Sequence, residues 1–480
     1  MKSQSTIDTQ IQFDDFSLGR QFFVALIILI LLCVGQFFIP LWQIVLGLIG
    51  ISLSYFILRN DLYTLLSYIG IIIAVKIRAR TEEISPIDIA AGMLMTGILF
   101  SLILKKILFP ARSLAPHSTF YFVLLFASWT LGIGLISIFN GVTTFNSWYR
   151  EFLTFSPLIF IPVLFNSITE QQEKAFKILI KFFLALWITE QIFAVMLIKQ
   201  SMKAAVFLYQ TGRANFDVAG NSVMIFIFLS LSFADTQIKN RKYYIVGILI
   251  SMVGLLLTFN RTGWVITIGL TLFMLFLTPK LQKKNRNAVI LRLLVILILG
   301  INIFLFFYPI INLLIKWSLF KFLTSSNLKT DASLYNRYVE WRYVWQQILS
   351  TPFTGTGFGG KFKDYIWITG VTIDSFYTHS GFFGILLKSG IVGFILIFTA
   401  YIKFFSLGIK LLYNKILNDK EIALVRAGLF IILLITFHMF TLNPFMHREI
   451  LLYLGLVWAY YIYLERKTKK YFLKPLVVND

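Results

Sequence analysis

The chain has 480 residues, of which 58% are hydrophobic and only 14% are charged, and its mean hydropathy is +0.79. A soluble domain carries about a quarter charged residues, so this composition excludes a water-soluble fold and requires lipid as the solvent. Lys and Arg number 44 against 22 Asp and Glu, which gives a net charge of +22. Because cytoplasmic loops of membrane proteins collect basic residues, we attribute this excess to membrane topology and expect no nucleic-acid partner.

Apolar runs recur along the whole chain. A membrane-spanning helix needs about 20 mostly apolar residues, so these runs predict an all-α polytopic protein with about 12–14 transmembrane helices. In chain order the candidate spans are 22–39, 41–58, 62–77, 87–104, 118–140, 149–165, 175–198, 221–236, 243–259, 262–278, 288–311, 381–404, 424–443 and 449–464. The polar start followed by two apolar runs indicates a first span rather than a cleaved signal peptide.

Basic residues in the connections predict the orientation. Clusters lie at 239–242, 280–286, 403–420 and 466–470. An even number of predicted spans separates each cluster from the next, so all four can lie in the cytoplasm together with both termini. The basic residues at 76–80 are the exception, since they fall outside. This topology predicts a single membrane domain over 1–480, with one large extracytoplasmic loop at 312–380.

Within that loop, residues 332–349 have the spacing of a short helix. Arg337, Trp341 and Trp345 stand at i, i+4 and i+8, which places them on one face, and Pro352 ends the pattern. An amphipathic helix lying on the membrane interface would show the same pattern. The two interpretations are compatible, because such a helix would also face the headgroup of a lipid substrate.

Residues 355–360, GTGFGG, fit the pattern G-x-G-x-x-G, and Lys361 extends it toward a P-loop. Phe362 stands where a P-loop needs Ser or Thr, and a helix with Pro352 precedes the segment instead of a strand. We therefore reject nucleotide binding. The glycines predict a flexible backbone turn, with N–H groups that an anion could use.

Two side chains stand out for their position. Arg261 lies between two apolar runs, where a charge is costly and usually functional, although an arginine can also snorkel from a helix end. Its planar fork is suited to a phosphate. His379 ends the large loop directly before the span at 381, and a neutral His can accept a proton from a hydroxyl. Arg213 and Arg342 are also predicted outside, as substrate-binding residues or as plain surface charge.

Several signatures are missing from the sequence. Cys33 is the single cysteine, no D-x-D motif occurs, and no His, Asp and Glu cluster has metal-ligand spacing. Metal-dependent sugar transfer is therefore disfavoured, and we expect no metal or cofactor.

Four short motifs in residues 250–400 occur in a familiar order. They are Asn260-Arg261 after an apolar span, Arg337 followed by Trp341, Pro352 followed by Gly355 and Gly357, and His379 followed by Gly390 and Gly393. This core resembles the O-antigen ligase and O-antigen polymerase family of bacterial membrane glycosyltransferases. Three positions depart from the family pattern: Asn260 replaces Ser, Ser380 replaces Asn, and Lys388 stands where an acid is common.

The resemblance implies a chemistry. The donor would be an oligosaccharide or polysaccharide on undecaprenyl diphosphate, in the bacterial cytoplasmic (inner) membrane, with the active site on the outer face. Arg261 and Arg337, with Arg213, would hold the diphosphate and stabilise its growing charge, and Trp341 and Arg342 would help to bind substrate. The resemblance makes His379 the group that orients or deprotonates the acceptor hydroxyl, in one inverting step without a metal.

Two questions stay open at this level. A polymerase would use another glycan as the acceptor, and a ligase would use an acceptor such as a lipid A core. The alternative class is a flippase for lipid-linked oligosaccharides, or another transporter embedded in membrane lipid. Such a protein would share the span count and the charge, but it would not need a folded outer loop and would usually show broken helices and repeats, which the sequence does not reveal.

Overall fold

The computed structural model describes residues 61–74, 117–168, 218–235, 237–258, 260–277, 332–366 and 370–473, with short pieces between 92 and 98, between 176 and 192, and at 287 and 290. Residues 1–113 and 114–480 form two compact units. Outside the described residues lie Arg213, the side chain of Arg261, the predicted spans 22–39 and 41–58, the predicted span 288–311 except for residue 290, and residues 312–331 of the predicted loop.

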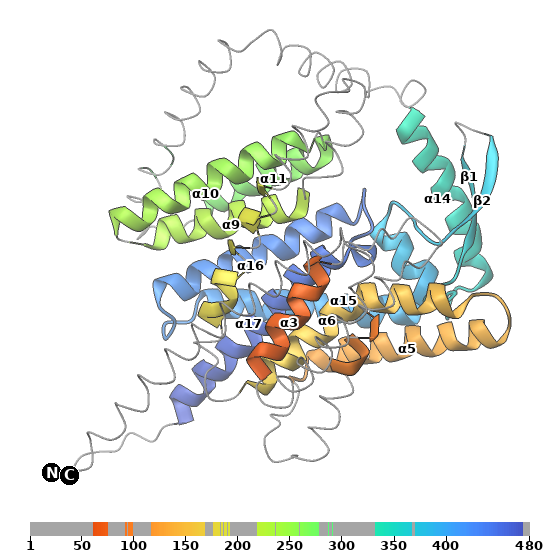
Figure 1. Cartoon of the computed structure of the whole chain (residues 1–480), viewed down its shortest axis with the longest axis horizontal. Coiled ribbons are helices and arrows are strands. Elements are labelled where there is room, and N and C mark those ends of the chain that lie inside the picture. Colours follow the sequence, from red (N-terminus) through yellow and green to blue (C-terminus); the bar gives the residue numbers. More distant parts are fainter. Residues whose placement is uncertain are drawn as a thin grey trace, which may run out of the picture. The chain divides into compact units, whose positions relative to one another are not determined.

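Helices dominate the described part of the chain (Figure 1). The first unit contains α3 (Asp61–Ala74), and the second contains α5 (Phe120–Phe139), α6 (Phe145–Ser167), α9 (Val218–Ala234), α10 (Ile238–Leu257), α11 (Arg261–Phe276), α14 (Ala332–Ser350), α15 (Gly381–Leu412), α16 (Asp419–His438) and α17 (Arg448–Leu473). Among them, α5, α15 and α16 are long and apolar enough to cross a membrane, and two shorter apolar helices lie at Val218–Ala234 and Thr262–Phe276. The predicted all-α membrane protein is confirmed, while the count of 12–14 spans stays a prediction.

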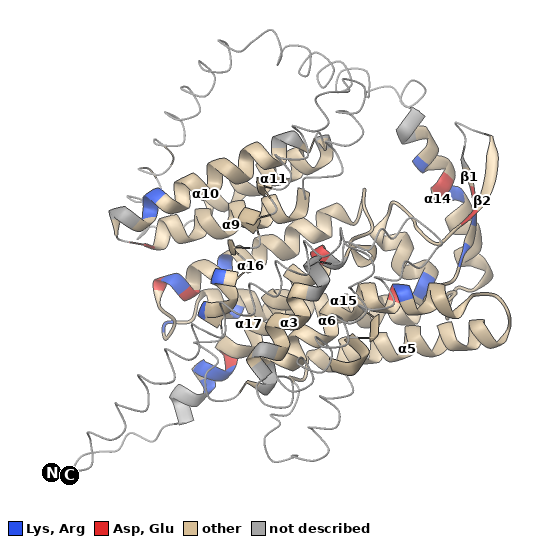
Figure 2. Cartoon of the chain, in the orientation of Figure 1, with Lys and Arg blue, Asp and Glu red and all other residues tan. Residues whose placement is uncertain are grey.

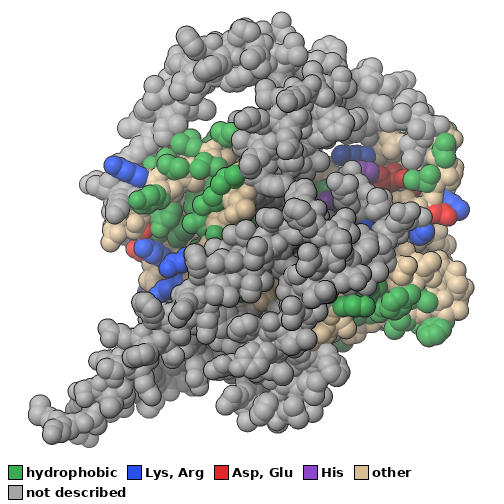
Figure 3. Space-filling view, in the orientation of Figure 1, with side chains coloured by type: hydrophobic (Ala, Val, Ile, Leu, Met, Phe, Trp, Pro, Cys, Tyr) green, Lys and Arg blue, Asp and Glu red, His purple; other side chains and the backbone are tan. Residues whose placement is uncertain are grey.

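Exposed apolar faces occur on several of the described helices. On α10, Tyr243, Val246, Ile250 and Val253 recur at helical spacing and are 42–66% exposed. Figure 3 shows such hydrophobic side chains gathered over α10, α11 and α5. A contiguous apolar face of this kind is stable only against lipid or another protein surface.

Small residues let the helices of the second unit approach closely. α9 packs against α10 and α16, α6 packs against α17, and α15 packs against α5. A Cβ added at Gly247 would lie 2.5 Å from the ring of Phe228, and one added at Gly408 would lie 2.7 Å from Leu429 and Tyr461. Close backbone approach through glycine is typical of helix contacts in membranes.

Three of the predicted basic clusters share one end of this bundle (Figure 2). At the start of α16, Lys420 Nζ lies 3.0 Å from Asp235 Oδ2 in the turn between α9 and α10. Near the end of α17, Lys467 Nζ lies 2.5 Å from Glu421 Oε1 of α16. The clusters at 239–242, 403–420 and 466–470 therefore gather as the positive-inside argument requires, and the side of the membrane on which they lie stays a prediction.

The segment after α14 contains a β-hairpin that we did not predict. Strand β1 (Phe362–Ile366) pairs antiparallel with β2 (Val371–Ser375), and Gly370 turns the chain with φ +69°. The hairpin packs on α14 and α15 through a small core of Val344, Ile348, Phe362 and Leu387. Residues 332–380 therefore fold into a compact layer at one end of the helices (Figure 1).

Candidate functional site

The GTGFGG loop is packed tightly against the neighbouring helices. The prediction of a flexible turn that could bind an anion is therefore wrong. Each backbone N–H from residue 355 to residue 360 already has an acceptor: Thr351 O, Leu387 O, Lys388 O, Thr130 O, Glu151 Oε2 and Gly357 O, in that order. Gly357 lies so close to α5 that an added Cβ would stand 2.3 Å from Gly134 N. No N–H of this loop is left to bind an anion.

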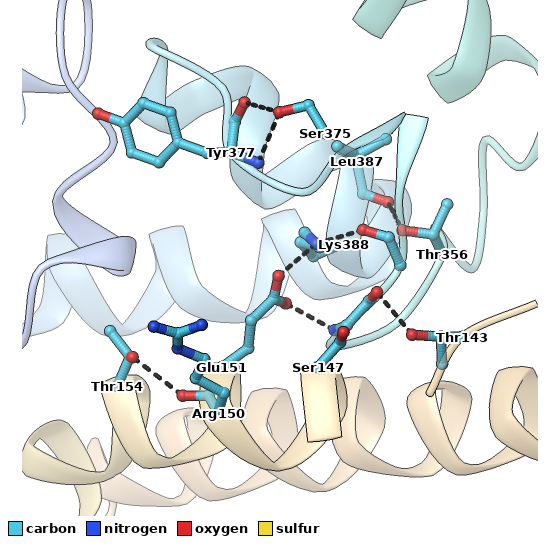
Figure 4. Close-up of polar contacts among 12 residues, drawn as sticks. Thr143, Ser147, Arg150, Glu151, Thr154, Thr356, Ser375, Tyr377, Leu387 and Lys388 are labelled. Carbon is cyan, nitrogen blue, oxygen red and sulfur yellow. Dashed lines mark hydrogen bonds and ion pairs between the residues drawn. The ribbon is translucent and has the colours of Figure 1, made fainter. Parts of the chain in front are cut away.

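A buried ion pair locks this loop to two helices (Figure 4). Lys388 Nζ of α15 lies 2.6 Å from Glu151 Oε1 of α6 and donates to the Gly360 carbonyl at 2.5 Å. Glu151 Oε2 accepts from the Gly359 N–H at 2.7 Å. The two side chains are 7% and 5% exposed, so each charge depends on the other and on the loop backbone.

The loop also supplies hydrogen-bond partners to the backbone at a break in α15. Gly390 has φ +60° inside this helix, which interrupts the helical hydrogen bonds. Ile391 N–H donates instead to Pro352 O, and the carbonyls of residues 387–389 accept from Thr356, Gly357 and the Trp129 indole. Through these contacts α14 and the hairpin take a fixed position over the head of α15.

At that head, His379 is held by a carboxylate that we did not predict. Glu340, on the buried face of α14, accepts the His379 backbone N–H through Oε1 at 2.7 Å. Its other oxygen, Oε2, lies 2.5 Å from His379 Nδ1. Glu340 is 1% exposed and His379 is 35% exposed, so the ring is anchored on one side and open on the other. Since an ionised carboxylate only accepts hydrogen bonds, Nδ1 carries the proton and Nε2 is the basic nitrogen.

Other groups surround this dyad. Asp364 of β1 is buried, and burial together with the charge of Glu340 raises its pKa to about 6, against the opposing effect of His379. Tyr377 lies edge-on to His379, with ring centroids 5.1 Å apart. Figure 3 shows basic, acidic and His side chains together in this part of the molecule. The site therefore concentrates ionisable groups at the surface of the folded layer, as acid–base sites often do.

The predicted residues on α14 divide between its two faces. Arg337 lies one turn before Glu340, on the same side of the helix. Trp341 packs against Phe383 of α15, with ring centroids 5.8 Å apart, and so helps to dock α14. Arg342 is exposed on the opposite face, so the structure does not bring it to His379.

Arg261 is the first residue of α11. Lys420 pairs with Asp235, so the start of α16 lies beside the turn before α10. The chain leads away from that turn along α10 and returns along α11, so α11 runs antiparallel to α16. Phe273 of α11 contacts Phe430 of α16, with ring centroids 5.9 Å apart. At about 1.5 Å per residue, the Arg261 backbone lies about 18 Å from this contact, toward the end of α16. The Gly381 N–H, at the start of α15, donates to Met439 O, at the end of α16, at 2.7 Å. The start of α11 and His379 therefore lie toward the same end of α16.

Two departures from the family pattern preserve a structural role. Asn260 caps α11 by accepting the Gly263 N–H at 2.9 Å, and Ser380 caps α15 by accepting the Phe383 N–H at 3.5 Å. Asn and Ser are both favoured N-cap residues, so an exchange between them keeps the helix start. The third departure, Lys388, is the cation of the buried pair with Glu151.

The residues that we missed had weak signals in the sequence. Glu151 and Lys388 both lie inside predicted spans, 149–165 and 381–404, and opposite charges in two spans indicate a pair. Glu340 is an acid on the face of the amphipathic helix that also carries Arg337. None of these signals says which distant residue is the partner.

The comparisons with known proteins agree with this layout. A family model described as O-antigen ligase matches residues 246–398, which run from α10 through α11, α14 and the hairpin into α15. No curated protein matches the chain. The predicted resemblance is confirmed over this segment, which holds His379, Arg261 and Arg337. Residues 246–398 of this chain are therefore similar to the O-antigen ligase family.

Proposed function

We propose that this protein transfers an oligosaccharide or polysaccharide from undecaprenyl diphosphate to a sugar hydroxyl, with inversion and without a metal, on the outer face of the cytoplasmic membrane. The observation that carries the proposal is the contact between Glu340 and His379 at the head of α15. A buried carboxylate that fixes one imidazole nitrogen leaves the other as an oriented base, which is the arrangement that hydroxyl activation requires.

In the proposed step the acceptor hydroxyl gives its proton to His379 Nε2. The acceptor oxygen forms a bond to the anomeric carbon as the bond from that carbon to the diphosphate oxygen breaks, and the diphosphate leaves with the electron pair. Glu340 stabilises the imidazolium that forms, because its carboxylate lies 2.5 Å from Nδ1. The acceptor attacks from the face opposite the leaving group, so the anomeric configuration inverts.

The positive charge for the leaving diphosphate would come from arginines. Arg261 stands at the N-terminus of α11, where backbone N–H groups and the helix dipole also favour an anion. Arg337 would approach from α14, and Arg213 would add a third guanidinium. Arginine forks match phosphate oxygens and stay charged at every working pH, so they can replace a divalent cation.

A transporter fits the structure less well. The break in α15 is the kind of feature that transporters use to bind ions, and the sequence did not reveal it. Its backbone groups, however, are paired with the loop and with Trp129. A folded layer with an oriented histidine serves a transferase and has no evident role in a flippase.

The test uses purified protein in detergent, a lipid-diphosphate-linked oligosaccharide and a glycan acceptor, with no ion gradient. We expect His379→Ala to slow transfer by about 10²–10⁴-fold and Glu340→Gln to slow it less. His117→Gln is the matched control, since this histidine pairs with Glu465, far along the chain from the dyad. Full activity of His379→Ala, or retention of the anomeric configuration in the product, would overturn the proposal.

A cellular experiment separates the two possible acceptors. Surface glycans and the lipid-linked pool of a deletion strain are compared on gels. Loss of long chains with single repeat units still attached identifies a polymerase, and long chains that stay on the lipid carrier identify a ligase. No change in either pool would count against a lipid-linked glycan donor.

A further inference from the structure

Asp364 faces Glu340 across the packing between β1 and α14. Phe362, on the inner face of β1, packs with Val344 and Ile348 of α14. Asp364 follows Phe362 by two residues, so it lies on the same face of β1, about 6.6 Å further along the strand. Glu340 lies one turn before Val344 on α14, about 6 Å away along the helix and in the same direction as Asp364 from Phe362. The strand register and the helix repeat thus set the two carboxyls side by side.

One oxygen of the Asp364 carboxyl has no hydrogen-bond partner in the described part of the chain. Asp364 is 9% exposed, and its Oδ1 atom is buried without a hydrogen-bond partner among the described residues. Glu340 already uses both of its oxygens on His379. Burying a second acid beside it destabilises the fold, so a residue of this kind calls for a functional explanation.

The charged groups around Asp364 are few. They are Glu340 and Arg337 on α14, His379 before α15, Lys361 directly before β1, Lys363 on β1, and Asp374 on β2. Lys363 Nζ lies 2.8 Å from Asp374 Oδ1, and both side chains are exposed on the hairpin. On the inner side, Glu340 repels the Asp364 carboxylate and His379 attracts it when protonated.

We propose that Asp364 is a positioning residue that acts through His379, as a second carboxylate that stabilises the imidazolium formed when the acceptor gives up its proton. The inference rests on the proposed function, since it needs His379 to be the base. Attraction between the two groups is reciprocal: the imidazolium favours ionised Asp364, and ionised Asp364 favours the imidazolium. The raised pKa of Asp364, about 6, makes this help strongest above pH 6.

Asp364→Asn tests the inference, because it keeps the shape and removes the charge. We expect kcat to fall about tenfold with KM within about twofold, as for the loss of about one pKa unit of basicity. The acid limb of the kcat profile should move about one pH unit lower, and the His379 ring titration followed by NMR should move with it. Asp364→Glu should recover part of the rate. Asp374→Asn removes an acid from the same hairpin and is the matched control.

Each outcome bears on the inference. A wild-type rate and profile in Asp364→Asn would overturn it, and so would an equal loss in Asp374→Asn. A purely structural role would change the yield or the Tm of Asp364→Asn but leave the midpoint of the His379 titration unmoved, and that result would also overturn the inference. An inactive His379→Ala beside a normal Asp364→Asn defeats this inference alone, whereas an active His379→Ala defeats the proposed function as well.

Discussion

Breaking the buried pair between Glu151 and Lys388 should destabilise the protein strongly. Glu151→Ala would leave the Gly360 carbonyl as the remaining partner of the Lys388 ammonium. It would also leave the Gly359 N–H without an acceptor. Removing one partner of a buried pair costs about 3–5 kcal/mol, because the other charge stays buried and uncompensated. Lys388→Met should cost a similar amount, since it leaves the carboxylate with the Gly359 N–H as its remaining donor here.

The assay is thermal unfolding in detergent at a fixed heating rate, followed by tryptophan fluorescence. At about 2 °C per kcal/mol, each single variant should lower the apparent Tm by about 6–10 °C. The double variant Glu151→Leu with Lys388→Met should lose about 2–3 kcal/mol less than the sum of the singles, because no lone charge remains. The control is the exposed pair of Lys363 and Asp374, 71% and 49% exposed, where Lys363→Met should change Tm by about 1 °C or less.

Two results would refute this reasoning. Single variants that shift Tm by less than about 2 °C would mean that water reaches the pair and screens each charge. A double variant whose loss equals the sum of the singles would mean that the side chains act independently.

Further predictions concern the loop, the hairpin and a helix cap. Gly357→Ala should abolish monodisperse protein in size-exclusion chromatography, because its Cβ would stand 2.3 Å from Gly134 N. Gly370→Ala, whose Cβ would have its nearest atom at 3.9 Å, should cost only about 1–2 kcal/mol of stability for its positive φ. Equal yields of the two variants would contradict this packing. Asp364→Asn should raise the stability at pH 7.5 by about 1–2 kcal/mol and have no effect near pH 4. The sign follows from the raised pKa of about 6, since deprotonation of the folded state removes stability as the pH rises from the unfolded pKa to 6; a gain in Tm at both pH values would contradict it. Ser380→Ala should lose about 1 kcal/mol of helix capping and Ser380→Asn should lose little, which thermal unfolding can compare.

The helices were predictable because their signals are local. The predicted spans 262–278 and 381–404 correspond to Arg261–Phe276 and Gly381–Leu412, and the predicted loop helix 332–349 corresponds to Ala332–Ser350. Apolar length, caps and proline act within one or two turns, so a sequence contains them directly. The starts of these helices agree within one residue, whereas α15 continues past the predicted end at 404 to Leu412, because a helix can continue beyond the end of its apolar run.

The hairpin and the acidic partners were not predicted. Residues 371–375, after Gly370, alternate apolar and polar side chains, which is a strand pattern, but the pattern is short and lies in a region expected to be loop. Glu151 and Lys388 are 237 residues apart, and Glu340 and His379 are 39 apart. A sequence can mark such charges as costly, but their partners depend on how α14 docks on α15.

The residues that support the break in α15 all come before that helix in the chain. A helix interrupted at Gly390 cannot use water to satisfy its opened backbone while it lies in hydrocarbon. Its substitute partners, Trp129, Pro352, Thr356 and Gly357, all precede α15 in the chain. Each donor and acceptor that the interruption needs has therefore been made before the helix itself leaves the ribosome. A circular permutation that placed α15 first would present the interruption without its partners and should insert poorly, even though every contact of the finished fold would be unchanged.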